Sequence, residues 1–266
     1  MIKLAIILTG TISPSVKGGC FTSKERFDMY SSTLDFYAHT IGKNYPIFFF
    51  ENSNADLSIW KEKYKDTLDL TMLQFRPGTE EYIDFDNSKG KGYNEYLMIK
   101  KGLLKMANTP PNQQVTHFLK ITGRYPMLNI KRILAEGKQK LSKGNTVFIG
   151  DIKDTCVYKL IGRKTLSSNW GDSRFFIAEI NYYRNKMIDC YQEMNDYEES
   201  RWAEHYFLRL SRQFRHDNRF QFRFKTQVRF GGVSGTSTMA SYDSKANRIK
   251  ASVRQLGRIL FPNIWF

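Results

Sequence analysis

Short apolar runs and segments with helical periodicity alternate along the first half of the chain. Each run has the length of a strand and is followed within a few residues by Gly, Asn or Pro, as buried strands often are. Between the runs, apolar residues recur three or four positions apart, which is typical of an amphipathic helix. The pattern predicts strands at 4–8, 46–50 and 70–75, and helices at 23–41 and 56–66, the first helix capped by Ser23.

The same alternation continues in the second half, with predicted helices at 93–106 and 129–141 and strands at 117–125, 146–150 and 173–180. Helical residues then dominate 182–215. Strands that alternate with helices usually form a parallel sheet with helices on both faces. We therefore expect an α/β fold with one mostly parallel sheet. A main domain over 1–242 would be followed by a helical, basic C-terminal appendage over 243–266.

The composition adds a strong positive charge: 41 Lys and Arg residues stand against 26 Asp and Glu, for a net charge of +15. This balance favours an anionic partner, such as nucleic acid, a nucleotide-activated metabolite or an acidic membrane surface. Three widely spaced cysteines predict no disulfide framework and indicate a reducing compartment. The N-terminal apolar run is too short for a signal peptide, and no run reaches the roughly 20 residues of a spanning helix. We expect a cytoplasmic protein, soluble or peripheral at the inner face of the plasma membrane.

The end of the predicted strand at 117–125 carries the most informative local chemistry. Lys120, Gly123 and Arg124 follow or interrupt apolar strand residues within a few positions of one another. Glycine permits a close backbone approach to a ligand, and the arginine fork suits phosphate or carboxylate. Ligands of α/β sheets bind at strand ends, so this segment is a candidate anion site. On these residues alone, a core strand with two snorkelling cations is an equally good interpretation.

Several short segments, taken in order, resemble small bacterial glycosyltransferases of the GT-A type that surface-polysaccharide gene clusters encode. The matching segments are Lys89–Glu95, Lys120–Tyr125, Trp170–Phe176, Trp202–His205 and Gly231–Thr236. The likeness is scattered from residue 4 to about 242, and the order of the segments is more specific than any one of them. It implies a GT-A-like, Rossmann-type sheet. It also implies transfer of a sugar from a nucleotide-diphosphate donor to a glycan acceptor, which we expect to be lipid-linked.

An inverting transferase needs one carboxylate to accept the proton of the acceptor hydroxyl. Glu198, Glu199 and Glu204 are candidates, and the resemblance favours Glu204, because the other two fit a solvated helix start. Asp172 is the second catalytic candidate and could instead bind hydroxyls of either substrate. The residues that we expect to bind the donor are Thr9, Gly10, Glu51, Asn52, Lys91, Gly92, Glu95, Lys120, Gly123, Arg124, Tyr125, Arg229, Ser234, Gly235 and Thr236. The stereochemical outcome, inverting or retaining, stays open.

The sequence departs from the family at its metal site. Most GT-A enzymes hold a divalent ion with an Asp-x-Asp motif, whereas the corresponding strand end here reads Thr122-Gly123-Arg124. Asp84-Phe85-Asp86 has the right letters, but it lies in a polar loop and we interpret it as solvated. We expect no cofactor, with a divalent metal not excluded. Lysines and arginines such as Lys91 would then neutralise the leaving diphosphate.

The glycine-rich segment 231–238 is a second phosphate candidate, because consecutive glycine N–H groups can converge on an anion. It lacks the Gly-Lys-Ser/Thr of a P-loop, and a flexible surface loop explains it equally well.

The C-terminal tail and the arginine-rich segment before it leave two partner classes open. Ile249, Val253, Leu256 and Leu260 fall on one face of a basic helix, which suits an anionic membrane interface or a helix packed on its own core. Eight Lys and Arg residues against two acids in 201–229, interleaved with phenylalanines, allow a nucleic-acid-binding protein as the alternative function. No nucleic-acid motif is present, so we expect nucleotide-sugar and glycan partners and no nucleic acid. A transferase-like scaffold without activity is the third possibility.

Overall fold

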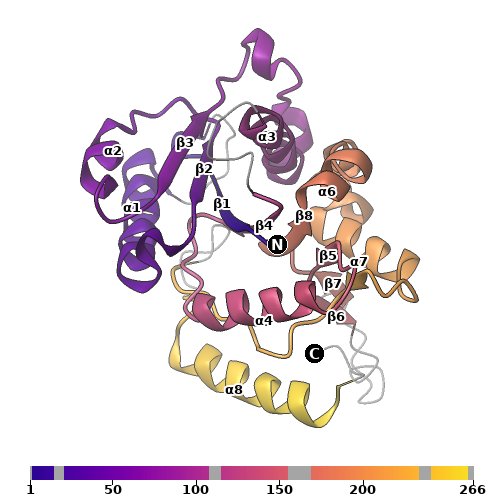
Figure 1. Ribbon diagram of the computed structural model, residues 1–266. Helices are drawn as coiled ribbons and strands as arrows, with labels where there is room; N and C mark the ends of the chain where they lie inside the picture. Colours follow the sequence, from indigo (N-terminus) through magenta and orange to yellow (C-terminus); the bar gives the residue numbers. More distant parts are fainter. Residues whose placement is uncertain (1, 15–20, 108–114, 155–168, 234–240, 263–266) are drawn as a thin grey trace.

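The computed structural model describes residues 2–14, 21–107, 115–154, 169–233 and 241–262. Its centre is a seven-stranded sheet in the order β3-β2-β1-β4-β8-β5-β9 (Figure 1). The strands are β1 (Leu4–Gly10), β2 (Ile47–Glu51), β3 (Leu70–Gln74), β4 (His117–Thr122), β5 (Phe148–Ile149), β8 (Phe175–Glu179) and β9 (Phe220–Gln221). A separate antiparallel pair joins β6 (Ile152–Asp154) to β7 (Asn169–Gly171). The expected mostly parallel α/β sheet is therefore confirmed.

Helices cover both faces of this sheet, as strand–helix alternation predicts. One apolar core lies between the sheet and α1 (Ser23–Thr40), α2 (Ser58–Tyr64) and α4 (Ile130–Ser142). The other lies beneath α3 (Gly90–Met106), α6 (Ile180–Lys186) and α7 (Ala203–Gln213). Residues 4–8 of β1 alternate between the two cores, so this part of the strand is buried on both faces of the sheet.

Two local predictions need correction. Thr22, and not Ser23, caps α1, in a capping box with Glu25. The helical stretch expected over 182–215 is divided into α6, two short 3₁₀ turns and α7. The predicted strand at 173–180 is confirmed as β8, which runs antiparallel to both of its neighbours, β4 and β5.

The order of the parallel strands creates a switch point in the sheet. From β1 the chain moves outward through β2 to β3, and then returns to place β4 on the other side of β1. Crevices for ligands form at the carboxyl ends of strands where the order reverses in this way. The switch point therefore lies at Thr9 and Gly10 of β1 and Thr122 of β4.

The C-terminal helix α8 (Lys245–Leu260) lies alongside the domain in Figure 1, beyond α4. Its Arg258 is buried and forms a two-pronged ion pair with Asp151, with N–O distances of 2.7 and 2.6 Å. Gln255 adds a hydrogen bond to the Lys225 carbonyl at 3.1 Å. Polar side chains thus attach α8 to the segment after β9 and to the end of β5.

Candidate functional site

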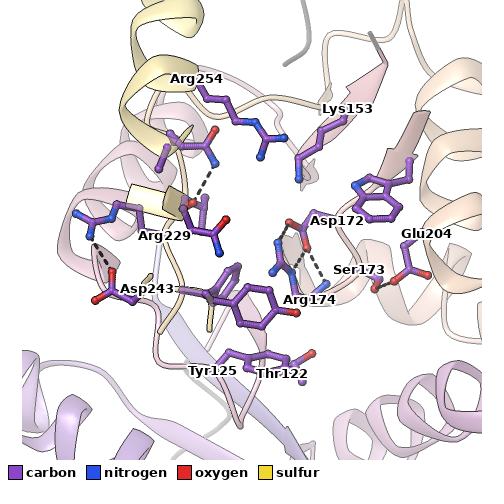
Figure 2. A pocket seen from close by; sticks show the side chains of 18 of the residues that line it. Thr122, Tyr125, Lys153, Asp172, Ser173, Arg174, Glu204, Arg229, Asp243 and Arg254 are labelled. Carbon is purple, nitrogen blue, oxygen red and sulfur yellow. Dashed lines mark hydrogen bonds and ion pairs between the residues drawn. The ribbon is translucent and has the colours of Figure 1, made fainter. Parts of the chain in front are cut away.

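Two cavities open at the switch point and share a wall. The smaller, of about 190 Å³, is lined by the ends of β1 and β2, by α1 and by the start of α3. The larger, of about 560 Å³, extends from β4 past the β6–β7 pair to α8 (Figure 2). Both are lined by Lys91, Glu95, Thr122 and Arg124. Two ligands that occupied the two cavities would therefore meet at this shared wall.

The shared wall is organised around the carboxylate of Glu95. Lys120 contacts it at 2.8 Å, and the hydroxyls of Thr9 and Thr122 donate to it at 2.5 and 3.0 Å. Burial opposes ionisation of Glu95, but Lys120 and these donors outweigh it and hold the pKa below its usual value. Glu95 is therefore an anion whose charge is compensated within the protein.

Lys120 lies beneath the site and lines neither cavity. Its side chain is fully buried, and its ammonium group also donates to the carbonyl of Ser173 at 2.8 Å. Lysine side chains are almost never fully buried unless they are paired, and Glu95 supplies the partner. The structure thus gives Lys120 a place in the supporting network, in contrast to the direct donor contact expected from the sequence.

Glu204 projects from the first turn of α7 into the larger cavity. The hydroxyl of Ser173 donates to its Oε1 at 2.8 Å, as Figure 2 shows. Burial raises the pKa of Glu204, and the Ser173 hydrogen bond only partly offsets this. A carboxylate with a raised pKa is a stronger proton acceptor than an ordinary one, which suits a general base.

Asp172 differs from Glu204 in its electrostatic surroundings. The Arg174 guanidinium donates a hydrogen bond to each carboxylate oxygen of Asp172, with N–O distances of 2.8 and 2.5 Å. Burial favours the neutral acid, but Arg174 and nearby Lys153 overcome it and lower the pKa of Asp172 to about 2. Two carboxylates of one cavity thus have pKa values shifted in opposite directions, a pattern that separates acid–base roles from binding roles. Asp172 is suited to accepting hydrogen bonds from substrate hydroxyls.

The Lys-Gly segment at the start of α3 is occupied by a carboxylate from elsewhere in the chain. Asp196 accepts hydrogen bonds from the backbone N–H groups of Lys91 and Gly92, at 2.6 Å and 3.1–3.2 Å. A Cβ atom at Gly92 would lie 2.8 Å from Asp196 Oδ1, so the glycine permits this close contact. A carboxylate stabilises a helix N-terminus as a phosphate would. The side chain of Lys91 lines both cavities.

The other expected donor residues divide between lining and support. Gly10 and Asn52 line the smaller cavity, and Asn52 accepts a hydrogen bond from the Thr11 hydroxyl at 2.6 Å. Glu51 is fully buried and accepts from the backbone N–H groups of Ser53 and Ile12, so it shapes the turn after β2. A Cβ at Gly123 would lie 3.0 Å from the Thr9 carbonyl, so this glycine keeps the ends of β1 and β4 close together.

Tyr125 and Arg229 line the larger cavity. Arg124 donates to the Tyr125 hydroxyl at 2.8 Å, and Arg229 pairs with Asp243 at 3.1 Å. Ser234, Gly235 and Thr236, predicted from the glycine-rich segment, lie outside the described residues.

The acidic pair of Asp84-Phe85-Asp86 faces away from both cavities. Asp84 pairs with Lys101 at 3.1 Å, and Asp86 accepts hydrogen bonds from the N–H and hydroxyl of Ser88. Only Phe85 of the three lines a cavity. Within the described ranges, no group of three or more His, Cys, Asp and Glu side chains is arranged to hold a metal ion.

Several cavity-lining residues were not singled out from the sequence. Arg26 and Tyr30 of α1 line the smaller cavity, and Tyr30 accepts a hydrogen bond from the Thr11 N–H at 3.0 Å. Lys153, Trp170 and Arg254 line the larger one. In the sequence, a cation near the start of the first predicted helix, shortly after Gly18 and Gly19, could have indicated Arg26. No comparable local signal marks the others, because the fold brings them together.

The phenylalanines that allowed a nucleic-acid-binding function are not available to bases. Phe220, Phe222 and Phe224 are buried, and Phe214 stacks on Phe220 with ring centroids 4.1 Å apart. Arg219 pairs with Asp217 nearby. The alternation of Phe and Arg in this segment therefore reflects core packing, and it provides no stacking platform of the kind that single-stranded nucleic acids require.

Comparisons with known proteins find likenesses in structure alone. No protein-family model matches the chain, and no curated protein matches its sequence. Similar solved structures include the galactosyltransferase LgtC (TM-score 0.47, 9% identity, 84% of this chain and 74% of that one). They also include the bifunctional glycosyltransferase WbbM (0.47, 8%, 96% and 44%) and a cytidylyltransferase of Leptospira borgpetersenii (0.43, 10%, 98% and 88%). At these values none of them assigns an activity to this chain.

Proposed function

We propose that this protein is a glycosyltransferase of the GT-A type that uses a nucleotide-diphosphate sugar. The observation that carries the proposal is the pair of cavities at the switch point, joined through a cationic wall and next to a protonatable carboxyl group. A transferase must hold two substrates that meet at one point, with a base beside the acceptor. The smaller cavity would take the nucleotide and the larger would take the donor sugar and the acceptor.

Cations of the shared wall would support departure of the nucleotide. Lys91 and Arg124 line both cavities, and Arg26 lines the smaller one. Fixed positive charges placed where charge develops in the transition state are among the largest contributions to catalysis. These side chains would therefore stabilise the negative charge on the diphosphate as its bond to the sugar breaks.

Glu204 would act on the acceptor. In the proposed inverting reaction, the acceptor hydroxyl oxygen bonds to the anomeric carbon while the bond from that carbon to the diphosphate oxygen breaks. The hydroxyl proton passes to Glu204, and the bonding electrons leave with the nucleoside diphosphate. Ser173 holds the carboxylate in position, and Asp172, kept ionised by Arg174, would accept hydrogen bonds from sugar hydroxyls.

A screen of nucleotide sugars by thermal shift, followed by hydrolysis and transfer assays, tests the proposal. We expect stabilisation by one class of nucleoside diphosphate sugar, and Arg124→Met should weaken it because the variant removes a charge-assisted contact. Ile83→Asp, an exposed change outside both cavities, is the matched control. Binding of no nucleotide sugar by the wild-type protein would refute the assignment.

The apolar side of α8 supports a lipid-linked acceptor and a membrane location. Ile249, Val253 and Leu256 are 59%, 66% and 57% exposed, whereas Arg258 on the opposite side is buried. Helix α8 thus contacts the rest of the protein through polar groups and exposes its apolar side to solvent. An ordinary surface helix does the opposite and buries its apolar side. Among the described helices, none is long and apolar enough to cross a bilayer.

We propose that this apolar side binds an anionic lipid surface at the inner face of the plasma membrane, where surface-polysaccharide acceptors are assembled. Lys245, Arg248 and Lys250 are exposed on the same helix, and basic residues beside an apolar side are typical of interfacial helices. The test is co-sedimentation with phosphatidylglycerol vesicles. The double variant Val253→Asp/Leu256→Asp should lose most binding, and Ile83→Asp on α3's neighbouring loop should keep it. Equal binding by both variants would exclude α8 as the membrane contact.

A further inference from the structure

The larger cavity contains more positive charge than departure of a nucleotide requires. Its lining includes eight Lys and Arg side chains and four carboxylates. Three of the carboxylates are already neutralised: Asp172 by Arg174, Asp243 by both Arg229 and Arg248, and Glu95 by a lysine beneath the wall. The fourth, Glu204, has a raised pKa. An excess of cations therefore remains in the cavity.

That excess is concentrated between the β6–β7 pair and α8. Lys153 of β6 and Lys250 and Arg254 of α8 line this cavity, and none of them lines the smaller one. In the part of the chain that the structure describes, none of the three has a carboxylate oxygen within 4.0 Å. Figure 2 shows Lys153 and Arg254 pointing toward one another from the two elements.

We infer that Lys153, Lys250 and Arg254 form a second anion subsite, which binds a phosphate or carboxylate group of the acceptor. Like charges that converge in one cavity repel one another, and an oxyanion between them removes that repulsion and gains charge-assisted hydrogen bonds. The donor diphosphate is provided for separately, because Lys91 and Arg124 lie where the cavities join. This inference rests on the proposed function for its acceptor, although the subsite itself can be tested without it.

The protonation equilibrium of Lys153 should respond to an anion bound beside it. Burial, with smaller effects of Arg174 and Arg254, lowers the pKa of Lys153 to about 8 against the opposing effects of Asp172 and Asp151. An anion bound between these groups favours the charged lysine. Affinity for the anion should therefore be greatest below pH 8 and should fall as the pH rises through 8 to 9, because the free lysine then loses its proton.

The Trp170 indole completes the subsite as a surface for a sugar or prenyl chain. It is 38% exposed, lines the larger cavity and lies 5.6 Å from the Lys153 ammonium. An aromatic ring next to cations is suited to a ligand that is apolar on one side and charged at one end. A phosphate of a lipid carrier and the carboxylate of an acidic sugar both meet this description.

Calorimetric titration with inorganic pyrophosphate tests the subsite directly. We expect Lys153→Met and Arg254→Met each to weaken pyrophosphate binding about tenfold or more. Lys245→Met, an exposed change on α8 outside the cavity, should leave it unchanged. Nucleoside diphosphate binding, measured in parallel, should be nearly the same in all variants. Circular dichroism checks that each variant is folded. If Lys153→Met or Arg254→Met does not fold, Lys250→Met replaces it in the test, because Lys250 is exposed.

The outcomes separate this inference from the proposed function. Unchanged pyrophosphate binding in the Met variants would overturn it, as would an equal loss of nucleotide binding, which would assign these cations to the donor. If no nucleotide sugar binds but pyrophosphate binding still depends on Lys153 and Arg254, the proposed function fails and the anion subsite stands. Farnesyl diphosphate and trigalacturonate, each compared with neutral maltotriose, then distinguish a phosphate from a carboxylate source. Preference for maltotriose over both would also overturn the inference.

Discussion

Replacing Arg258 by Leu should detach α8 from the domain. The guanidinium and the Asp151 carboxylate are 1% and 2% exposed, and the arginine also donates to the Phe224 carbonyl and to Gln227. Removing one partner of a buried ion pair typically costs about 3–5 kcal/mol, chiefly because the other charge is left buried and alone. The docking equilibrium of α8 should therefore shift by roughly 10²- to 10⁴-fold.

Hydrogen exchange of the α8 amides, followed by mass spectrometry, measures this shift. Protection of residues 245–260 should fall in Arg258→Leu while the central strands remain protected, because the pair attaches α8 alone. Arg254→Leu is the matched control, because it makes the same substitution one turn earlier at a residue that has no ion-pair partner among the described residues. It should change the protection of the α8 amides only a few-fold. Adding Asp151→Asn to Arg258→Leu should recover part of the loss, since no charge then remains unpaired. Protection that survives in Arg258→Leu, or a double variant worse than the sum of both single changes, would refute the reasoning.

Further predictions concern the shared wall and its base. Glu204→Gln should lower kcat about 10²- to 10⁴-fold without loss of donor binding; undiminished turnover would show that another group is the base. In the wild type, kcat/KM should rise with pH through a pKa above the usual carboxylate range, since burial raises the pKa of Glu204 and the base must be ionised. Ser173→Ala should move that limb to higher pH, because the lost hydrogen bond favoured the carboxylate; an unmoved limb would separate it from Glu204. If Lys91 and Arg124 provide the neutralising charge, EDTA should leave donor turnover intact, whereas loss in EDTA and recovery with manganese would contradict this.

Much of the fold was predictable because it follows from local periodicity. Apolar runs of strand length separated by amphipathic segments require a covered parallel sheet, and the carboxyl ends of its strands then share one edge. That reasoning was sufficient to bring Thr9, Asn52 and Arg124 to one cavity from three separate strands. The direction of β8 was not predictable, since an apolar run has the same composition in either orientation.

The sequence did not allow us to predict which residue pairs with each charged side chain of the site. Lys120 and Glu95 are 25 positions apart, Asp196 and Gly92 are 104 apart, and Arg258 and Asp151 are 107 apart. Of these residues, Glu95, Lys120 and Gly92 were predicted from the sequence to bind the donor. Asp151, Asp196 and Arg258 were not singled out. Whether a charged side chain faces a ligand or another residue depends on which helix covers which side of the sheet, and such long-range contacts leave no periodic signal.

The pairing of Lys120 with Glu95 changes how the missing Asp-x-Asp motif is understood. A metal-binding site needs carboxylates whose negative charge is directed at the ligand. Here the Glu95 carboxylate of the shared wall forms an ion pair with the fully buried Lys120. Its negative charge is therefore neutralised within the protein. The cations that line both cavities beside Glu95 are Lys91 and Arg124. Under the proposed function, these fixed positive charges would attract the donor diphosphate where most GT-A enzymes use a metal ion.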